Sequence, residues 1–218
     1  MTLWLSGVVL VAGLLGAGDP PAEDSGFVPL FNGESLAGWQ KIGAKADVWR
    51  VEEGKLVCSG DGGGWLATEK PYANFELRLE FRLSPGSNSG IYLRAPADTS
   101  HISRTGMEIQ LLDETDPRYK DIKPWQRSGA IYHVKAPEPG HLKPTGEWNA
   151  IEIRAEGPHV VVRLNGATIV NDRLDAHPDL EAEHTGLKRK EGRIGLQSHN
   201  DRVEFRKIRI KELGASTP

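Results

Sequence analysis

The chain has 218 residues, of which 38% are hydrophobic and 26% charged, a composition typical of a folded globular domain. The first 26 residues contain no Lys or Arg and three acidic residues, so the remainder holds 27 basic and 30 − 3 = 27 acidic residues and has no formal net charge. Because proteins that bind nucleic acid usually carry a basic patch and a high pI, nucleic acid is not an expected partner.

The N-terminal segment resembles a secretory signal peptide. Residues 3–15 form an apolar run, and Gly16-Ala17-Gly18 follows it as a small-residue cleavage site. We therefore expect a signal peptide over 1–18, a linker over 19–26, one domain over 27–213 and a tail over 214–218. The protein is then exported to the periplasm or outside the cell and has no membrane contact after cleavage. An uncleaved membrane anchor is the alternative, and the lone Cys58 excludes an intramolecular disulfide.

The rest of the chain predicts strands and turns almost throughout. Short runs of β-branched, aromatic and alternating apolar residues lie between Gly, Pro, Asn and Ser clusters. We expect strands at 49–51, 55–59, 75–83, 89–95, 107–112, 129–133, 148–156, 159–164, 168–171, 193–198 and 203–211. We find no long amphipathic helix in the sequence. Many antiparallel strands without crossover helices indicate an all-β fold, either two packed sheets or a closed barrel, and we favour the sandwich.

Three local signals refine this expectation. Residues 75–83 alternate apolar and charged side chains, which is typical of a strand with one buried face. Asn165-Gly166 lies between two apolar runs and predicts a tight hairpin, because both residues tolerate positive φ. The alternation shifts at Lys207, which suggests a bulge, and the glycine-rich stretch 60–64 is expected to be a hairpin tip.

Polar side chains gather on one face of two expected strands. Side chains of a strand alternate between faces, so Asn88, Tyr92 and Arg94 should share one side of their strand. In the next strand Glu108 and Gln110 alternate with apolar residues in the same way. Amide, phenol, guanidinium and carboxylate groups side by side suit a polyhydroxylated ligand.

Familiar catalytic and metal-binding signatures are absent from the sequence, which has no Gly-x-Ser-x-Gly elbow and no His-Glu-x-x-His motif. Residues 177–184 contain His and acidic side chains, but their polar surroundings and Pro178 favour a solvated connection over a metal site.

Several longer motifs, in order, resemble the 3-keto-disaccharide hydrolase domain family over about 27–213. They are LFNGESLAGW (30–39), NSGIYLR (88–94), GMEIQ (106–110), SGAIY (128–132), GEWN (146–149) and GRIGLQSH (192–199). The resemblance implies a concanavalin-like jelly-roll sandwich of two antiparallel sheets in an exported bacterial protein. It also implies an enzyme acting on an oxidised carbohydrate, which cleaves the glycosidic bond of a 3-keto-glycoside after proton abstraction next to the ketone.

That chemistry requires a base, a group that stabilises the enolate oxygen and an acid for the leaving group. Our hypothesis assigns proton transfer to Glu108 or His199 and oxyanion stabilisation or hydroxyl binding to Arg94. The expected substrate-binding residues are Asn88, Tyr92, Gln110, Tyr132 and Gln197. A divalent metal ion in the electrophile's place remains an open alternative.

Three other interpretations stay open. A laminarinase-like retaining glycosidase would need a bulge that brings Asp113 to the Glu108 face, because its two carboxyl groups lie about 5–5.5 Å apart. A non-catalytic carbohydrate-binding module would use Trp65, Trp125 and Tyr132 as stacking platforms. Arg94 and Glu108 could also be a solvated cross-strand ion pair without a catalytic role.

Overall fold

The structure is a computed structural model that describes residues 25–45, 47–60, 62–199 and 201–214. The expected signal peptide, nearly all of the linker and most of the C-terminal tail lie outside these residues. Within the described ranges, none of the helices combines the length and apolar character that a membrane crossing needs.

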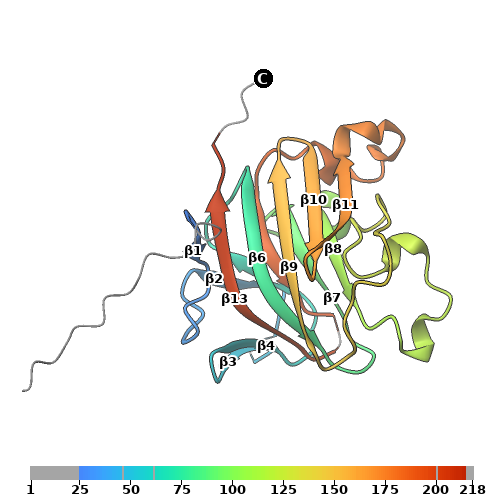
Figure 1. The fold of residues 1–218 in the computed structure, drawn as a ribbon. Helices are drawn as coiled ribbons and strands as arrows, with labels where there is room; N and C mark the ends of the chain where they lie inside the picture. The colour runs from blue at the N-terminus through green and yellow to red at the C-terminus, as the bar shows by residue number, and fades with distance from the viewer. Residues whose placement is uncertain (1–24, 46, 61, 200, 215–218) are drawn as a thin grey trace, which may run out of the picture.

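Two antiparallel sheets lie face to face, as Figure 1 shows. The larger sheet has the order β11-β10-β9-β6-β13-β4-β3, with β1 also paired to β13. Its strands are β1 (Val28–Pro29), β3 (Trp49–Glu52), β4 (Lys55–Cys58), β6 (Phe75–Leu83), β9 (Trp148–Glu156), β10 (His159–Leu164), β11 (Ala167–Arg173) and β13 (Val203–Glu212). The smaller sheet has the order β2-β5-β12-β7-β8. Its strands are β2 (Trp39–Ile42), β5 (Trp65–Thr68), β7 (Asn88–Ala95), β8 (Met107–Leu112) and β12 (Arg193–Gln197).

Short helices connect the strands at the ends of the sandwich. They are α1 (Ile102–Thr105), η2 (Pro117–Tyr119), η3 (Pro124–Gln126), η4 (Leu174–Ala176), η5 (Pro178–Leu180) and η6 (Thr185–Lys188). The sandwich predicted from the sequence is confirmed, with a largely continuous apolar core between the sheets. Along β6 every odd-numbered residue is buried, and these side chains meet the inward side chains of the smaller sheet.

Two of the local predictions are confirmed. Asn165 and Gly166 both have positive φ (50° and 89°) and join β10 to β11. Lys207 has φ 53° where the pairing of β13 with β6 shifts register, as expected of a bulge. The prediction that 60–64 is a hairpin tip is wrong, because this stretch connects β4 in the larger sheet to β5 in the smaller one. The strand expected at 129–133 is also not formed, because there Ile131 makes only isolated bridges, to Ile109 in β8 and to Lys135.

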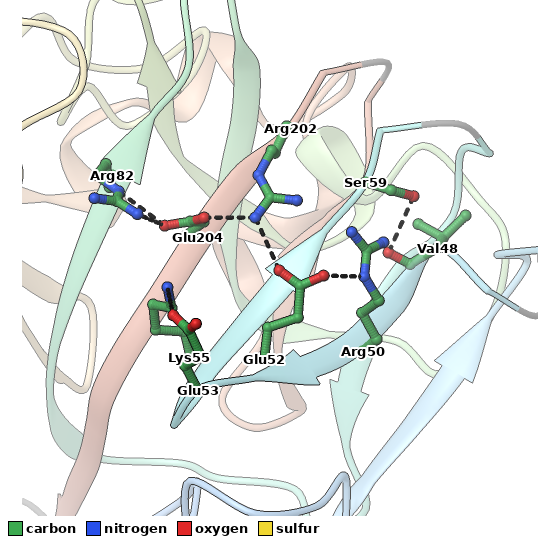
Figure 2. A network of polar contacts seen from close by, with 9 residues as sticks. All are labelled: Val48, Arg50, Glu52, Glu53, Lys55, Ser59, Arg82, Arg202 and Glu204. Carbon is green, nitrogen blue, oxygen red and sulfur yellow. Dashed lines mark hydrogen bonds and ion pairs between the residues drawn. The ribbon is translucent and has the colours of Figure 1, made fainter.

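The outward face of the larger sheet is charged, and Figure 2 shows the network at its β3 end. Arg82 on β6 donates from Nε to Glu204 on β13 at 2.8 Å. Arg202 bridges Glu204 (2.6 Å) and Glu52 (3.0 Å), and Glu52 accepts from Arg50 at 2.5 Å. This face therefore holds ion pairs, and the outward face of the smaller sheet is the polar face of interest.

Candidate functional site

The predicted polar residues of β7 and β8 lie side by side. The two strands pair without a register shift, with Tyr92 opposite Glu108 and Gly90 opposite Gln110. Side chains opposite each other on neighbouring strands share a face. Gln110 Nε2 also donates to Asn88 Oδ1 at 3.1 Å, so the amides are held at one end of this face.

Glu108 lies at the centre of the face and is buried. Its exposed fraction is 3%, and burial raises the pKa of its carboxyl group to about 8. Among the described residues it makes no hydrogen bond or ion pair through its carboxylate. A Cβ at Gly90 would stand 2.3 Å from Glu108 Oε1, so the carboxyl group lies over a position where only glycine fits. The result is a carboxyl group poised to exchange a proton near neutral pH.

Tyr92 stands next to Glu108 and is held by the neighbouring strand. Gln197 Nε2 on β12 donates to the Tyr92 hydroxyl oxygen at 2.8 Å, which leaves the Tyr92 O–H free to donate elsewhere. Burial and the nearby Glu108 raise the pKa of Tyr92 well above its usual value, so it stays protonated. The Trp65 ring packs edge-on against Tyr92 at 5.6 Å and supports it from the other side.

Tyr132 extends the face beyond the edge of β8. Ile131 bridges Ile109, and the Tyr132 amide donates to the Glu108 carbonyl at 2.9 Å. This register brings the main chain of Tyr132 opposite Glu108. The Tyr132 ring packs edge-on against Trp125 at 5.0 Å, which restricts its orientation.

A hollow of about 270 Å³ adjoins Tyr92 and Gln197. Its walls are formed by Ile42, Gly43, Gly64, Trp65, Tyr92, Thr99, Ser100, Ile102, Gln197 and Ser198. Within the described residues, Gln197 Oε1 and Ser198 Oγ are buried without a hydrogen-bond partner. Buried polar atoms are rarely left unpaired, so these two groups favour a ligand that carries hydroxyl groups.

Arg94 does not lie on this face, and its predicted placement beside Asn88 and Tyr92 is wrong. The pairing of β7 with β12 shifts register between Tyr92 and Ala95, and Arg94 has φ 48°. The strand alternation therefore breaks just before Arg94. Its guanidinium is buried and donates to four neutral oxygens, namely Ala73 O (2.8 Å), Gly157 O (2.6 Å), Arg189 O (3.3 Å) and Asn74 Oδ1 (3.4 Å). The alternative of an Arg94–Glu108 ion pair is wrong, because the Arg94 guanidinium contacts these oxygens and not Glu108.

His199 is exposed just after β12 and is not part of the buried cluster. Two residues further on, Asp201 accepts a hydrogen bond from the Asn88 backbone N–H at 3.2 Å, which brings this segment to the Asn88 end of the face. Among the described residues, no group of three or more His, Cys, Asp or Glu side chains is arranged to hold a metal ion. The cluster on the face thus comprises Asn88, Tyr92, Glu108, Gln110 and Gln197, with the Tyr132 main chain hydrogen-bonded to Glu108.

The structure also bears on the other two interpretations. The unbroken register of β8 leaves Asp113 off the Glu108 face, and its carboxylate accepts from Gly86 N at 2.8 Å and Thr115 Oγ1 at 2.6 Å. Asp113 therefore does not supply the second carboxylate that double displacement would need beside Glu108. Trp65 is 2% exposed and cannot serve as an open stacking platform.

Sequence reasoning missed the residues that shape the face. Gly90 makes room for the Glu108 carboxyl group, and a Cβ at Gly195 would stand 2.2 Å from the Trp65 ring. Glycine inside a strand often marks a close approach, so Gly90 and Gly195 carried a usable signal. Trp65 was expected as an exposed stacking platform, whereas it is buried and packs edge-on against Tyr92.

Comparison with known proteins agrees with the motifs. The model of the family described as "3-keto-alpha-glucoside-1,2-lyase-like domain" matches residues 26–211. The chain is 30% identical to a 3-keto-disaccharide hydrolase of Bacteroides thetaiotaomicron, over 88% of this chain and 80% of that protein.

Solved structures show the same architecture. A Parabacteroides distasonis protein solved as a "putative glycosyl hydrolase" is 29% identical, with TM-score 0.75 over 86% of this chain and 99% of that one. A Bacillus subtilis protein with a galectin-like fold is 12% identical, with TM-score 0.56 over 85% and 94% of the chains, and shares the fold alone. The expected jelly-roll type of sandwich is confirmed.

Proposed function

Because the chain belongs to the 3-keto-alpha-glucoside-1,2-lyase-like domain family, and with it to the hydrolases that act on glycosides, we propose that its substrates are 3-keto-glycosides. The name of the Bacteroides relative supports a 3-keto-disaccharide as the substrate class. The observation that carries the proposal is the buried Glu108 carboxyl group, with its raised pKa, among the polar side chains of the smaller sheet.

The proposed reaction begins at the carbon next to the ketone. A ketone at C3 acidifies the C2–H bond, so a carboxylate can remove this proton and leave an enolate. The electron pair then forms the C1–C2 double bond and expels the C1 oxygen substituent, which takes up a proton as it leaves. Addition of water across the C1–C2 double bond places a hydroxyl group on C1 and a hydrogen on C2, and the net result is hydrolysis.

The cluster offers a group for each early step. Glu108 is the proposed base, since a base with a pKa near the working pH combines availability with proton affinity. The Tyr92 O–H, which Gln197 holds in place, would donate to the enolate oxygen or a ring hydroxyl. Asn88, Gln110 and Tyr132 would orient the sugar. His199, exposed beyond β12, is the second candidate for proton transfer, to the leaving group.

The experiment is an assay of purified protein on a 3-keto-disaccharide and its unoxidised parent, with the spontaneous alkaline reaction subtracted. We expect cleavage of the oxidised substrate only. Glu108→Gln should lower kcat/KM by about 10²–10⁴-fold, whereas His199→Ala should lower it less. Full activity in Glu108→Gln would remove the proposed base. Tight sugar binding without turnover of either substrate would instead favour a carbohydrate-binding module.

The pH dependence tests the direction of proton transfer. A base must be deprotonated, so kcat/KM should rise with pH and level off above about 8, the pKa of Glu108. An acid role for Glu108 would reverse the profile, with activity falling through the same pH range. The measurement is kcat/KM from pH 5 to 9 for the wild type and Tyr92→Phe, which should keep the profile at a lower rate.

We also propose that the protein is exported, because residues 1–18 have the apolar run and small-residue cleavage site of a signal peptide. Expression of the full chain with cell fractionation and N-terminal sequencing tests this. A mature protein that begins near residue 19 outside the cytoplasm is the expected result, and an intact N-terminus in the cytoplasm would contradict it.

A further inference from the structure

A second hollow lies away from the Glu108 face, and we name it the Arg94 pocket. It encloses about 550 Å³ between the end of β7, the β9–β10 turn and the segment 174–190. Its walls are formed by Ala73, Asn74, Arg94, Gly157, Pro158, Leu174, Asp175, Glu181, Leu187, Lys188, Arg189 and Lys190. This volume lies within the range of about 300–1,000 Å³ that is usual for small-molecule sites.

Arg94 is a buried positive charge without a negative partner. Its exposed fraction is 1%, and all four acceptors around its guanidinium are neutral oxygens. A guanidinium has five N–H donors, so at least one remains without an acceptor among the described residues. Burial lowers the pKa of Arg94 to about 10, which reflects the cost of keeping the charge there. An anion in the pocket would offset that cost.

The rim adds further positive charge. Glu181 pairs with Lys188 at 2.5 Å and Asp175 with Arg173 at 2.6 Å, so both acidic wall residues already have cationic partners. Within the described ranges, Arg189 and Lys190 have no carboxylate within ion-pair distance. Arg189 instead donates from Nε to the Arg94 carbonyl at 2.8 Å, which places its side chain against the backbone of Arg94.

The remaining wall is apolar. Leu174 and Leu187 are both buried and belong to the hydrophobic core, with Ala73 and Pro158 on the same lining. A small inorganic anion would leave this surface without contacts, whereas a ligand with an apolar body would cover it.

We propose that the Arg94 pocket binds a small organic carboxylate, with its oxyanion toward Arg94, Arg189 and Lys190 and its apolar body on Leu174 and Leu187. Bound carboxylate and guanidinium form charge-assisted hydrogen bonds, which are about twice as strong as neutral ones. The site is independent of the Glu108 face, so it would take a ligand other than the glycoside that is cleaved.

Benzoate is the probe, and benzamide is its neutral counterpart of nearly the same shape. Leucine methyl resonances, assigned by substitution of Leu174 and Leu187, are followed by NMR while each compound is added at constant ionic strength. We expect saturable shifts of these methyl groups with benzoate and weak or no saturation with benzamide. Inorganic phosphate, which lacks an apolar body, should leave the methyl groups unmoved.

Lys190→Glu tests the charge without disturbing the buried Arg94, because Lys190 is exposed. The benzoate Kd should rise about five- to tenfold, since the substitution reverses a charge at the rim. Lys120→Glu, an exposed lysine outside the pocket, is the matched control and should change the Kd by less than about twofold. Arg94→Lys, if folded, should weaken benzoate binding further, because a point charge replaces the guanidinium fork.

Three results would overturn the proposal. Equal saturation by benzoate and benzamide would show a hollow that selects only for the apolar body. Absence of saturable shifts up to about 50 mM benzoate would show that the pocket is not a ligand site. An equal loss of affinity in Lys190→Glu and Lys120→Glu would show a nonspecific response to net charge.

Discussion

At the scale of single residues, the burial of Glu108 couples the proposed chemistry to stability. Its folded-state pKa of about 8 lies above the usual value of 4.5, so the folded protein holds this proton more tightly than the unfolded chain. The contribution of Glu108 to stability is then greatest below about pH 4.5 and is lost as pH rises through about 8.

Glu108→Gln should therefore stabilise the fold at alkaline pH. The amide stays neutral, so the variant should have a higher free energy of unfolding than the wild type at pH 9, by an amount on the order of a few kcal/mol, and a similar one at pH 4.5. Urea unfolding at both pH values measures the difference. If the difference in free energy of unfolding between the variant and the wild type were the same at both pH values, the Glu108 carboxylate would not be buried in charged form.

Gly90→Ala should lower activity without unfolding the protein. The new Cβ would meet Glu108 Oε1 at 2.3 Å, so the carboxyl group must move from the position beside Tyr92. We expect kcat/KM to fall by at least about tenfold, because displacement of a catalytic group by about 1 Å has large effects. Gly214→Ala is the control, since nothing lies within 4 Å of a Cβ there, and equal activities would contradict the role of Gly90.

Most of the site could be predicted from alternation in two strands, and the failure at Arg94 has a definite cause. Asn88, Tyr92, Glu108 and Gln110 follow the period of two that any regular strand imposes. Arg94 departs from it because the strand bulges just before it, and no glycine or proline marks that bulge in the sequence. Its contacts with the carbonyls of Ala73 and Gly157 come from distant segments that alternation cannot reveal.

At the scale of elements, the network of Figure 2 joins β3, β6 and β13 through Glu204. Burial alone would raise the pKa of Glu204, but the hydrogen bonds from Arg202 and Arg82 outweigh it and lower this pKa. A lowered folded-state pKa contributes stability above the unfolded value, and this contribution is lost as pH falls through the folded value.

Glu204→Gln should destabilise the protein by about 1–3 kcal/mol near neutral pH, because Arg82 and Arg202 lose a buried charged acceptor. The difference from the wild type should shrink in acid. Glu53→Gln, also drawn in Figure 2, is the control. The Glu53 side chain is 86% exposed, so this substitution should change stability by less than about 0.5 kcal/mol. Equal effects of the two substitutions in chemical denaturation would contradict this account.

Strands of six or more residues were predicted to within two residues at each end, whereas several of the shorter strands were missed. β6, β8, β9 and β10 have the expected bounds, whereas β2 and β5 were not anticipated. Four residues are too few to show a clear period. β2 is extended because it pairs with β5, and β5 because it also pairs with β12. The crossing from β4 to β5 was likewise unpredictable, because its glycines are equally compatible with a hairpin.

At the scale of the whole molecule, both sheets depend on strands from distant parts of the chain. β13 pairs with β6 on one side and β4 on the other, and it also holds β1. Removal of residues 203–218 should therefore abolish cooperative unfolding, whereas removal of 215–218 should preserve it. Near-UV circular dichroism during heating measures this, and a folded 1–202 protein would contradict the dependence on β13.

The central place of β13 has a consequence for biosynthesis. A polypeptide leaves the ribosome from its N-terminus, so β3 and β4 emerge long before the strand that links them to β6. Until residues 203–212 appear, the two parts of the larger sheet have unpaired edges, and such edges favour aggregation. If the protein is exported, this delay would help, because a precursor whose larger sheet cannot yet form remains unfolded enough to pass through a secretion channel.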